Sequence, residues 1–363
     1  MKQIVTLLKA LIFLGTLFSG LAMMVTGIAG ITAKVQHTYI TLAAIAFPFL
    51  AWGAALFWFL SLITLQWKSL LFQTLCFALS MPMLLHTFGF HLMQPRESAG
   101  SFRVMSYNVS GFNEQEGKPT EMLQYIRSKE PDIICFQEFS ARPEKYGYTL
   151  QQICDSLPEY RYYHFHSHHT TRFNSGVGTA IFSKFPITSV EPIPYESRIN
   201  SSCLYRISIQ GKSVTLINNH LESNGLSEMD IHFIRKLVKN FHLDYIPLVD
   251  DIVKEKIAVA AQKRLSQARH ITEIAKQSGG DYVILCGDIN DTPLSPTLRL
   301  LREHYSDAFV KAGKGMGATH RMVRSGLRID YLLHSPTLIP HRFETGKVYF
   351  SDHYPAFCSF TFE

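Results

Sequence analysis

The sequence predicts an α/β protein attached to a membrane, in which apolar helices precede one large domain with two β-sheets. From Ala10 to Pro95 the only charged residues are Lys34 and Lys68, which leaves three long uncharged segments. After residue 101, short β-rich runs alternate with helical patterns. Such alternation over about 260 residues is typical of one two-sheet domain rather than of two small domains.

The three uncharged segments are each longer than the ~20 apolar residues that cross a bilayer as a helix. They are Ala10–Ala33, Thr38–Trp67 and Ser69–Pro95. The sequence therefore predicts a membrane domain over residues 1–93. Its three transmembrane helices are expected at Leu11–Ile31, Ile40–Leu62 and Leu70–Phe90.

Lysine placement predicts the orientation of these helices. With the N-terminus inside, Lys2, Lys9 and Lys68 lie on the cytoplasmic side, against Lys34 and Arg96 outside. A cleaved signal peptide is the alternative for the first segment, but its apolar run is too long and two further runs follow at once. We expect a multi-pass membrane protein whose C-terminal domain lies on the extracytoplasmic (periplasmic or outer) face.

Residues 94–101, "QPRESAGS", predict a linker, because proline, glycine, serine and mixed charge separate two hydrophobic regions. Residues 102–363 then form the expected C-terminal α/β domain. Its predicted strands are "FRVMSYNV", "DIICFQE", "GTAIFSK", "SVTLINNHL", "YVILCGDIN", "RIDYLLH" and "YPAFCSFTF". Helices are expected at Thr120–Ser128 and Lys254–Lys276. The six cysteines show no metal-binding or disulfide spacing, so buried free thiols are expected.

Polar side chains follow these apolar strands where the strands end or begin. They are Asn108, Glu138, His220, Asp288, Asn290, Asp330, Asp352 and His353. Any one of them is explained more simply by a turn or a surface position. Because all of them directly adjoin apolar runs, the set indicates a hard-cation site beside acid–base groups at one sheet edge.

The motifs "MSYNV", "FQE", "NNHL", "GDIND", "RIDYLL" and "SDHYP" occur in this order, and "GVGTAIFSKFPI" precedes the third. The set resembles the endonuclease/exonuclease/phosphatase superfamily of DNase-like metal-dependent phosphoesterases, here in a membrane-anchored, bacterial-type member. The resemblance covers nearly all of residues 102–363 and none of the membrane part. It implies a four-layered α/β sandwich of two packed mixed β-sheets with outer helices.

The resemblance also implies a metal site. Glu138 would be the principal ligand, with Asn108 close by and Asp352 binding the same ion or a second one. Carboxylate and amide oxygens suit Mg²⁺, which keeps several water ligands, and Mn²⁺ could substitute.

The remaining roles are implied in the same way. His353 would accept a proton near neutral pH, with Asp330 fixing its tautomer. Asp288 would orient or activate the attacking water, Asn290 would hold a phosphate oxygen and His220 would donate a hydrogen bond to the phosphate. Whether His353 or Asp288 takes the proton stays open.

These observations favour a metal-dependent phosphoric ester hydrolase, a phosphodiesterase or phosphatase, that acts near the bilayer surface. The candidate substrate is a lipid or glycolipid headgroup. A membrane-tethered endonuclease or exonuclease is the alternative. It is not favoured, because the insertion from Glu222 to Arg264 carries seven acidic and seven basic residues and so provides no basic stripe for nucleic acid. A non-catalytic binding module is weakest, because every chemically demanding position holds a competent residue.

The expected partners are therefore the phosphoester substrate and the lipid bilayer, while protein partners stay unknown from the sequence. Within the insertion, "HFIRKLVKNFHLDYIPL" has apolar residues at helical spacing with Arg235, Lys236 and Lys239 between them. This amphipathic basic helix packs either on its own domain or on the lipid surface.

Overall fold

The computed structural model describes residues 2–32, 38–91, 98–112, 119–141, 148–167, 176–197, 199–240, 242–321 and 326–363. They form two compact units that interleave along the chain. The helical unit comprises Met1–Phe88, Leu226–Gln262 and Thr292–Arg299. The sandwich unit comprises Gly89–Gly225, Lys263–Asp291 and Leu300–Glu363. The helical unit thus includes two segments from the region predicted to be the catalytic domain.

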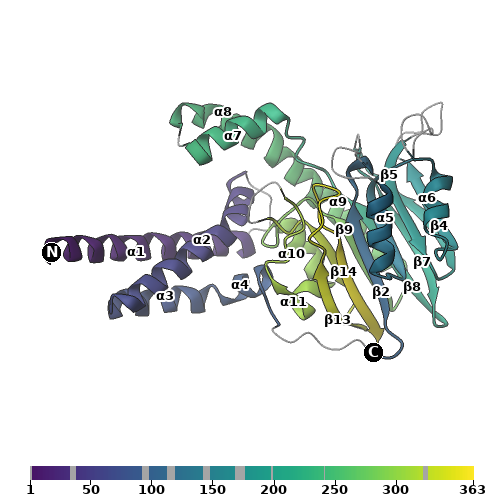
Figure 1. Ribbon diagram of the computed structural model, residues 1–363, viewed down its shortest axis with the longest axis horizontal. Helices are drawn as coiled ribbons and strands as arrows, with labels where there is room; N and C mark the ends of the chain where they lie inside the picture. Colours follow the sequence, from purple (N-terminus) through teal and green to yellow (C-terminus); the bar gives the residue numbers. More distant parts are fainter. Residues whose placement is uncertain are drawn as a thin grey trace. The chain divides into compact units, whose positions relative to one another are not determined.

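The apolar N-terminal helices behave largely as predicted. Helices α1 (Lys2–Thr32) and α2 (Thr38–Ile63) are each long and apolar enough to cross a membrane (Figure 1). The third predicted span is divided into α3 (Trp67–Leu79) and α4 (Met81–Thr87), which are bent by 65°. Pro82 lies in the first turn of α4, where its ring would clash with the preceding turn of a continuous helix. The described helices therefore provide two spans, or three if the bent pair crosses as one.

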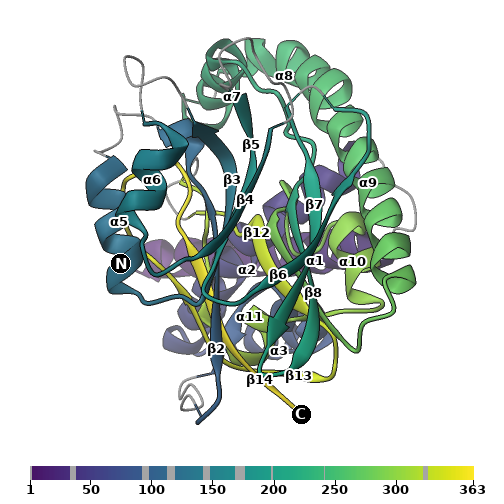
Figure 2. The same cartoon turned by 90° about the vertical axis from the view of Figure 1, so that its right-hand side faces the viewer.

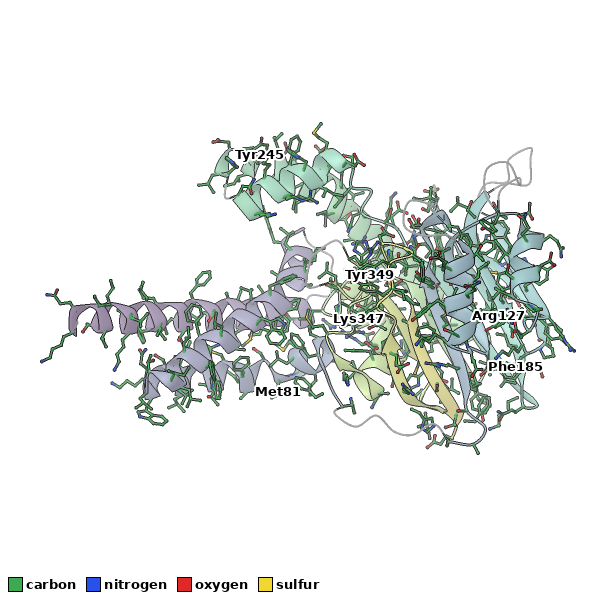
Figure 3. The ribbon with its side chains drawn as sticks, in the orientation of Figure 1. Met81, Arg127, Phe185, Tyr245, Lys347 and Tyr349 are labelled. Carbon is green, nitrogen blue, oxygen red and sulfur yellow. The ribbon has the colours of Figure 1, made fainter. Side chains whose placement is uncertain are left out.

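The insertion adds a helical hairpin to this unit. Helix α7 (Glu228–Asn240) is followed by the 3₁₀ turn η4 (Leu243–Tyr245) and α8 (Ile246–Ile252). The rings of Phe233 and Tyr245 pack 5.6 Å apart and link α7 to the turn. Tyr245 marks this end of the hairpin in Figure 3.

The helix predicted at Lys254–Lys276 is present in two parts. A π-helical turn, η5 (Val253–Ile257), leads into α9 (Ala258–Gln277). Further along, the start of α10 (Pro296–Arg302) is capped, because the Ser295 hydroxyl accepts a hydrogen bond from the backbone nitrogen of Leu298 at 3.2 Å.

The sandwich unit contains two six-stranded sheets. The first has the order β13-β14-β2-β3-β5-β4 and the second the order β10-β12-β9-β8-β7-β6. The strands of the first are β2 (Phe102–Asn108), β3 (Ile133–Ala141), β4 (Tyr162–Ser167), β5 (Gly176–Ser183), β13 (Leu338–Thr345) and β14 (Ala356–Phe362). Those of the second are β6 (Ile187–Ile193), β7 (Ser202–Ile209), β8 (Lys212–His220), β9 (Tyr282–Asp288), β10 (Ser306–Asp307) and β12 (Asp330–His334). Both sheets are mixed, because β2–β3 and β8–β9 are parallel and the other pairs are antiparallel.

The two sheets pack face to face, with helices on their outer faces (Figure 2). The central core joins apolar side chains from both sheets, including Val104 and Cys135 of the first and Leu216 and Cys286 of the second. On the outside of the first sheet, α5 (Pro119–Ser128) and α6 (Leu150–Ser156) form a separate core with β3. The long helix α9 lies on the side of the second sheet. The predicted four-layered sandwich is confirmed.

Three short elements complete the sandwich unit. Helix α11 is Ala308–Ala312, and strands β1 (Gly89–Phe90) and β11 (Lys314–Gly315) pair antiparallel. The described cysteines all have free thiols.

A buried polar contact joins the two sheets near the end of β8. The Asn218 side chain of β8 donates to the backbone oxygens of Phe136 and Ala180 in the other sheet, at 3.0 and 3.1 Å. Its amide oxygen accepts a hydrogen bond from Gln137 at 2.7 Å. Since buried amides are stable only when they are fully hydrogen-bonded, this contact fixes how the sheets stack.

Gly287 of β9 permits a close approach between two strands. A Cβ at this position would lie 1.9 Å from the backbone oxygen of Asn219, its partner in β8, and its φ is +128°. At Gly211, φ is +80° but nothing lies within 4 Å. We expect Gly287→Ala to lower the free energy of unfolding by about 3 kcal/mol or more, and Gly211→Ala by about 1 kcal/mol. Thermal unfolding of the full-length protein measures both, and equal losses would show that the strand contact is unimportant.

Candidate active site

Neighbouring strands of the second sheet bring three of the predicted residues side by side. His220 is the last residue of β8 and is paired with Asp288, the last residue of β9. Asp288 is in turn paired with Asp330, the first residue of β12. All three are buried. Because β8 is parallel to β9 and β12 is antiparallel to β9, the ends of β8 and β9 and the start of β12 lie side by side at the same edge of the sheet.

His353 completes this group from a segment just before β14. Its Nδ1 lies 2.9 Å from Asp330 Oδ2, and its Nε2 lies 3.7 Å from Asp288 Oδ2. The ring is 5% exposed. The buried Asp330 carboxylate thereby holds the imidazole so that Nε2 faces Asp288.

The first sheet contributes Asn108 at the end of β2 and Glu138 within β3. The Asn108 side-chain nitrogen donates to Glu138 Oε1 at 3.1 Å and to Asp288 Oδ2 at 3.0 Å. His220 Nε2 lies 3.7 Å from the same Glu138 oxygen and 3.8 Å from Asp288. Carboxylates from both sheets therefore converge on one point at the edge of the sandwich.

The backbone is strained where it presents two of these residues. Glu138 has φ +48° and Asn290 has φ +56°, in the left-handed region that side chains other than glycine rarely adopt. Glu138 lies at a β-bulge, where the register of β3 against β5 shifts between Phe136 and Phe139. Bulges of this kind redirect a side chain, and such strain concentrates at functional sites.

Asn290 is held by two hydrogen bonds. Its backbone nitrogen donates to Asp288 Oδ1 at 2.9 Å, and its side-chain nitrogen donates to the backbone oxygen of Leu221 at 3.0 Å. These two bonds fix the position of Asn290 next to Asp288.

Asp352 lies at the mouth of the site, and its side chain is 48% exposed. Ser351 connects it to β2, because the Ser351 hydroxyl lies 2.8 Å from the Asn108 backbone oxygen and 3.2 Å from Asp352 Oδ1. His320 Nε2 lies 3.7 Å from Asp352 Oδ2, and its ring is 4.6 Å from that of His353.

Three supporting residues were not predicted from the sequence. Ser351 and His320 contact Asp352, and the Thr319 hydroxyl accepts from the backbone nitrogens of Ile329 and Asp330 at 3.0 Å. Ser351 is the first residue of the motif "SDHYP", so this motif was the feature of the sequence from which Ser351 could have been predicted. Thr319 and His320 lie in an irregular segment that shows no periodic pattern.

The electrostatics of the group separate the two histidines. Burial opposes a charge on His353, but Asp330, Asp288 and Asp352 outweigh it and raise the pKa of His353 to about 10. Burial lowers the pKa of His220, although Asp288 opposes this effect. Burial also raises the pKa of Asp288, against the charge of His353. The surroundings thus favour the charged form of His353 and the neutral form of His220, on either side of the Asp288 carboxylate.

Asp352 differs from these buried carboxylates. Burial alone would raise the pKa of Asp352, but the hydrogen bond from His320 and the charge on His353 outweigh it, so that its pKa lies below the ordinary value. Asp352 is therefore ionised and accessible at the mouth of the site.

The donor set fits a hard divalent cation. Carboxylate oxygens of Glu138, Asp352 and Asp288 and the amide of Asn108 are the ligands that Mg²⁺ prefers. Among the described residues, the buried atoms Asp330 Oδ1 and His220 Nε2 have no hydrogen-bond partner. Binding through Asn108 requires its amide oxygen, which here accepts from the Ser110 nitrogen at 3.0 Å, to turn toward the carboxylates.

The model of the endonuclease/exonuclease/phosphatase family matches residues 105–353 of the chain. No curated protein matches it.

Several solved structures share the fold. An endonuclease/exonuclease/phosphatase from Beutenbergia cavernae DSM 12333 is 17% identical, with a TM-score of 0.52 and 72% of each chain covered. The human Nocturnin catalytic domain with bound sulfate is 17% identical, with a TM-score of 0.50 over 73% of this chain and 94% of that one. A mannosyl-6-phosphatase from Bacteroides thetaiotaomicron VPI-5482 is 16% identical, with a TM-score of 0.50 over 72% and 100%. Since the family match spans more than half of its length, the chain belongs to the endonuclease/exonuclease/phosphatase family of phosphoester hydrolases.

Proposed function

We propose that this protein is a membrane-anchored, divalent-metal-dependent phosphoesterase that hydrolyses a phosphoester near the bilayer surface, with a lipid or glycolipid headgroup as the favoured substrate. The observation that carries the proposal is the buried His353–Asp330 pair, whose free Nε2 faces Asp288 beside the converging Glu138 and Asn108 side chains. Such a set combines a proton-exchanging imidazole with the oxygen ligands of a cation.

The residues of the chain divide the work of phosphoester cleavage. His353 and Asp288 together orient the attacking water and exchange its proton, and Asp330 keeps the imidazole in one tautomer. His220, neutral and with a free Nε2, donates a hydrogen bond to a phosphate oxygen, and Asn290 holds another. Proton transfer is assigned to the His353–Asp288 pair as a unit.

Glu138, Asn108 and Asp352 are the residues that would hold Mg²⁺, or Mn²⁺ in its place. When bound, the cation supplies positive charge that stabilises the developing charge on the phosphate oxygens. The half-exposed positions of Glu138 and Asp352 leave their carboxylates open to an ion arriving from solvent.

A substrate panel tests the proposal. Full-length protein in detergent, with magnesium, is offered phospholipids, inositol phosphates, and single- and double-stranded DNA. We expect turnover of a phospholipid or inositol phosphate and none by the isosteric variant Asp288→Asn. Preferential cleavage of DNA would replace the proposal with a membrane-tethered nuclease, and no turnover of any substrate would favour a binding module.

Contact with the lipid bilayer is part of the same proposal. In the helical unit, α2 contacts η5 at the base of the hairpin, and Tyr39 near the start of α2 lies close enough to influence Lys254. At the other end of the hairpin, Leu243, Ile246 and Leu248 are 65%, 50% and 43% exposed. Three exposed aliphatic side chains within six residues are unfavourable in water and suit the interface of a bilayer.

We therefore expect the tip of the hairpin to touch lipid. Leu243→Cys, labelled with an environment-sensitive fluorophore in the full-length protein and reconstituted into vesicles, should be quenched by brominated lipids. The same label at Lys276→Cys, an exposed position on α9, should not be quenched. Equal quenching at the two positions would contradict lipid contact by the hairpin.

The predicted sidedness has its own test. A reporter that is active only outside the cytoplasm, fused after Glu363, should be active if three spans begin with the N-terminus inside. A silent reporter, together with an active cytoplasmic reporter at the same position, would place the sandwich unit in the cytoplasm.

A further inference from the structure

The sandwich unit contains a cavity of about 1050 Å³ that the proposed chemistry does not use. We propose that it binds a second anionic group, a phosphate or sulfate carried on a ring, in the non-reacting part of the substrate. This inference rests on the proposed function and specifies its substrate class. The cavity, here called the basic pocket, is lined by Lys129, Lys314, Arg321, Arg342, Lys347 and one acid, Glu344, together with aromatic side chains.

The charge of the basic pocket is strongly positive. Glu344 is already bound, because Arg103 donates to its Oε2 at 2.8 Å and Arg342 donates to its Oε1 at 2.7 Å. Lys129, Lys314 and Lys347 have no acidic partner among the described residues. Cations gathered around a concave surface without counter-charges focus the potential and attract an anion.

Aromatic side chains give the basic pocket its second property. Lys129 Nζ lies 5.4 Å from the centre of the Tyr125 ring, and the Arg321 guanidinium lies 5.3 Å from that of Tyr349. Tyr349 and Tyr354 pack edge to face at 6.1 Å. Lys347 and Tyr349 are labelled in Figure 3. Tyrosine rings interleaved with cations suit a ligand that carries a ring beside its negative charge, so the cations bind the anionic group and the tyrosines add contact with the ring.

The basic pocket shares its backbone with the candidate active site. Arg321 follows His320 and Tyr354 follows His353, and the two histidines face each other in a β-bridge. The Arg321 backbone nitrogen donates to the Asp352 oxygen at 3.0 Å, and the Tyr354 nitrogen donates to the Thr319 oxygen at 2.6 Å. Two short segments therefore carry catalytic candidates and pocket walls on successive residues, which places a ligand of the pocket close to the reacting phosphoester.

Binding is tested first, without turnover. Full-length protein in detergent and EDTA is titrated with pyrophosphate, and the dissociation constant is compared with that of Lys129→Ala/Lys347→Ala. We expect the double variant to bind at least tenfold more weakly, whereas the matched control Lys276→Ala, an exposed lysine on α9, should bind as the unmodified protein does. Equal binding by the double variant, at an unchanged thermal midpoint, would overturn the basic pocket as an anion site.

Turnover then identifies the ligand as part of the substrate. On bis-p-nitrophenyl phosphate, which has no second anionic group, the double variant should retain kcat and KM. On an inositol bisphosphate its KM should rise about tenfold at unchanged kcat. A loss of kcat on the simple diester would contradict the proposal, because the lysines would then act on the catalytic geometry. Pocket-dependent pyrophosphate binding without turnover of any phosphoester would reject the proposed function and leave the anion site standing.

Discussion

Replacing His353 by alanine is expected to lower kcat by roughly 10²–10⁴-fold, the usual contribution of a positioned acid–base group. Its Nδ1 is bonded to Asp330 at 2.9 Å and its Nε2 faces Asp288 at 3.7 Å, so one ring lies between the two buried carboxylates. Steady-state hydrolysis of a generic diester measures the loss. His304→Ala, at an exposed surface histidine, is the matched control and should be unaffected.

The hydrogen-bonded pair of His353 and Asp330 predicts that the losses of kcat caused by His353→Ala and by Asp330→Ala are not additive. If Asp330 acts only through His353, then His353→Ala with Asp330→Ala should cost about as much as His353→Ala alone. Removing His353 alone also leaves a buried carboxylate without its partner, so the single variant should be less stable than the double variant. Losses in kcat that multiply independently would show that Asp330 and His353 do not form one catalytic unit.

Glu138→Gln should nearly abolish activity at ordinary magnesium concentrations and raise the concentration needed for half-maximal rate by at least about tenfold. The substitution keeps the shape of the side chain at its strained position, φ +48°, but removes the charge that would hold the cation. The rate as a function of magnesium concentration measures the effect. Glu121→Gln, the same chemical change on the exposed face of α5, is the control.

Asp352 and His353 should differ in the same titration. Loss of Asp352, as a metal ligand at the mouth of the site, should be partly relieved by excess magnesium or manganese, because added ion compensates weakened coordination by mass action. Loss of His353 should not be relieved, because the ion cannot replace the imidazole of the His353–Asp288 proton-exchanging pair. Metal rescue of His353→Ala would mean that these neighbouring residues have the opposite roles.

Local sequence signals predicted one two-sheet α/β domain and a group of polar residues at one sheet edge, whereas the four-layered sandwich was implied by the resemblance of the motifs. Each residue directly adjoins an apolar strand, and strands such as β8, β9 and β12 place their ends together once they pair in register. The third membrane helix was predicted as continuous, because hydropathy does not register that Pro82 stops the α-helical hydrogen-bond ladder.

Other features depend on contacts between residues distant in the chain. The left-handed backbone of Glu138 arises from a bulge in the pairing of β3 with β5, which no single strand's sequence encodes. The contact between Ser351 and the Asn108 oxygen joins residues 243 positions apart. His320 reaches Asp352 through an irregular segment. Local periodicity contains no information about such long-range pairings.

The predictions above all depend on the proposal that these residues form a metal-dependent phosphoesterase site. Hydrolysis of bis-p-nitrophenyl phosphate by the full-length protein, before and after removal of divalent ions with EDTA and after readdition of magnesium, tests it most directly. We expect turnover that is lost with EDTA, restored by magnesium and absent in Glu138→Gln and His353→Ala. Turnover that persists in EDTA, or that is unchanged in both variants, would contradict it.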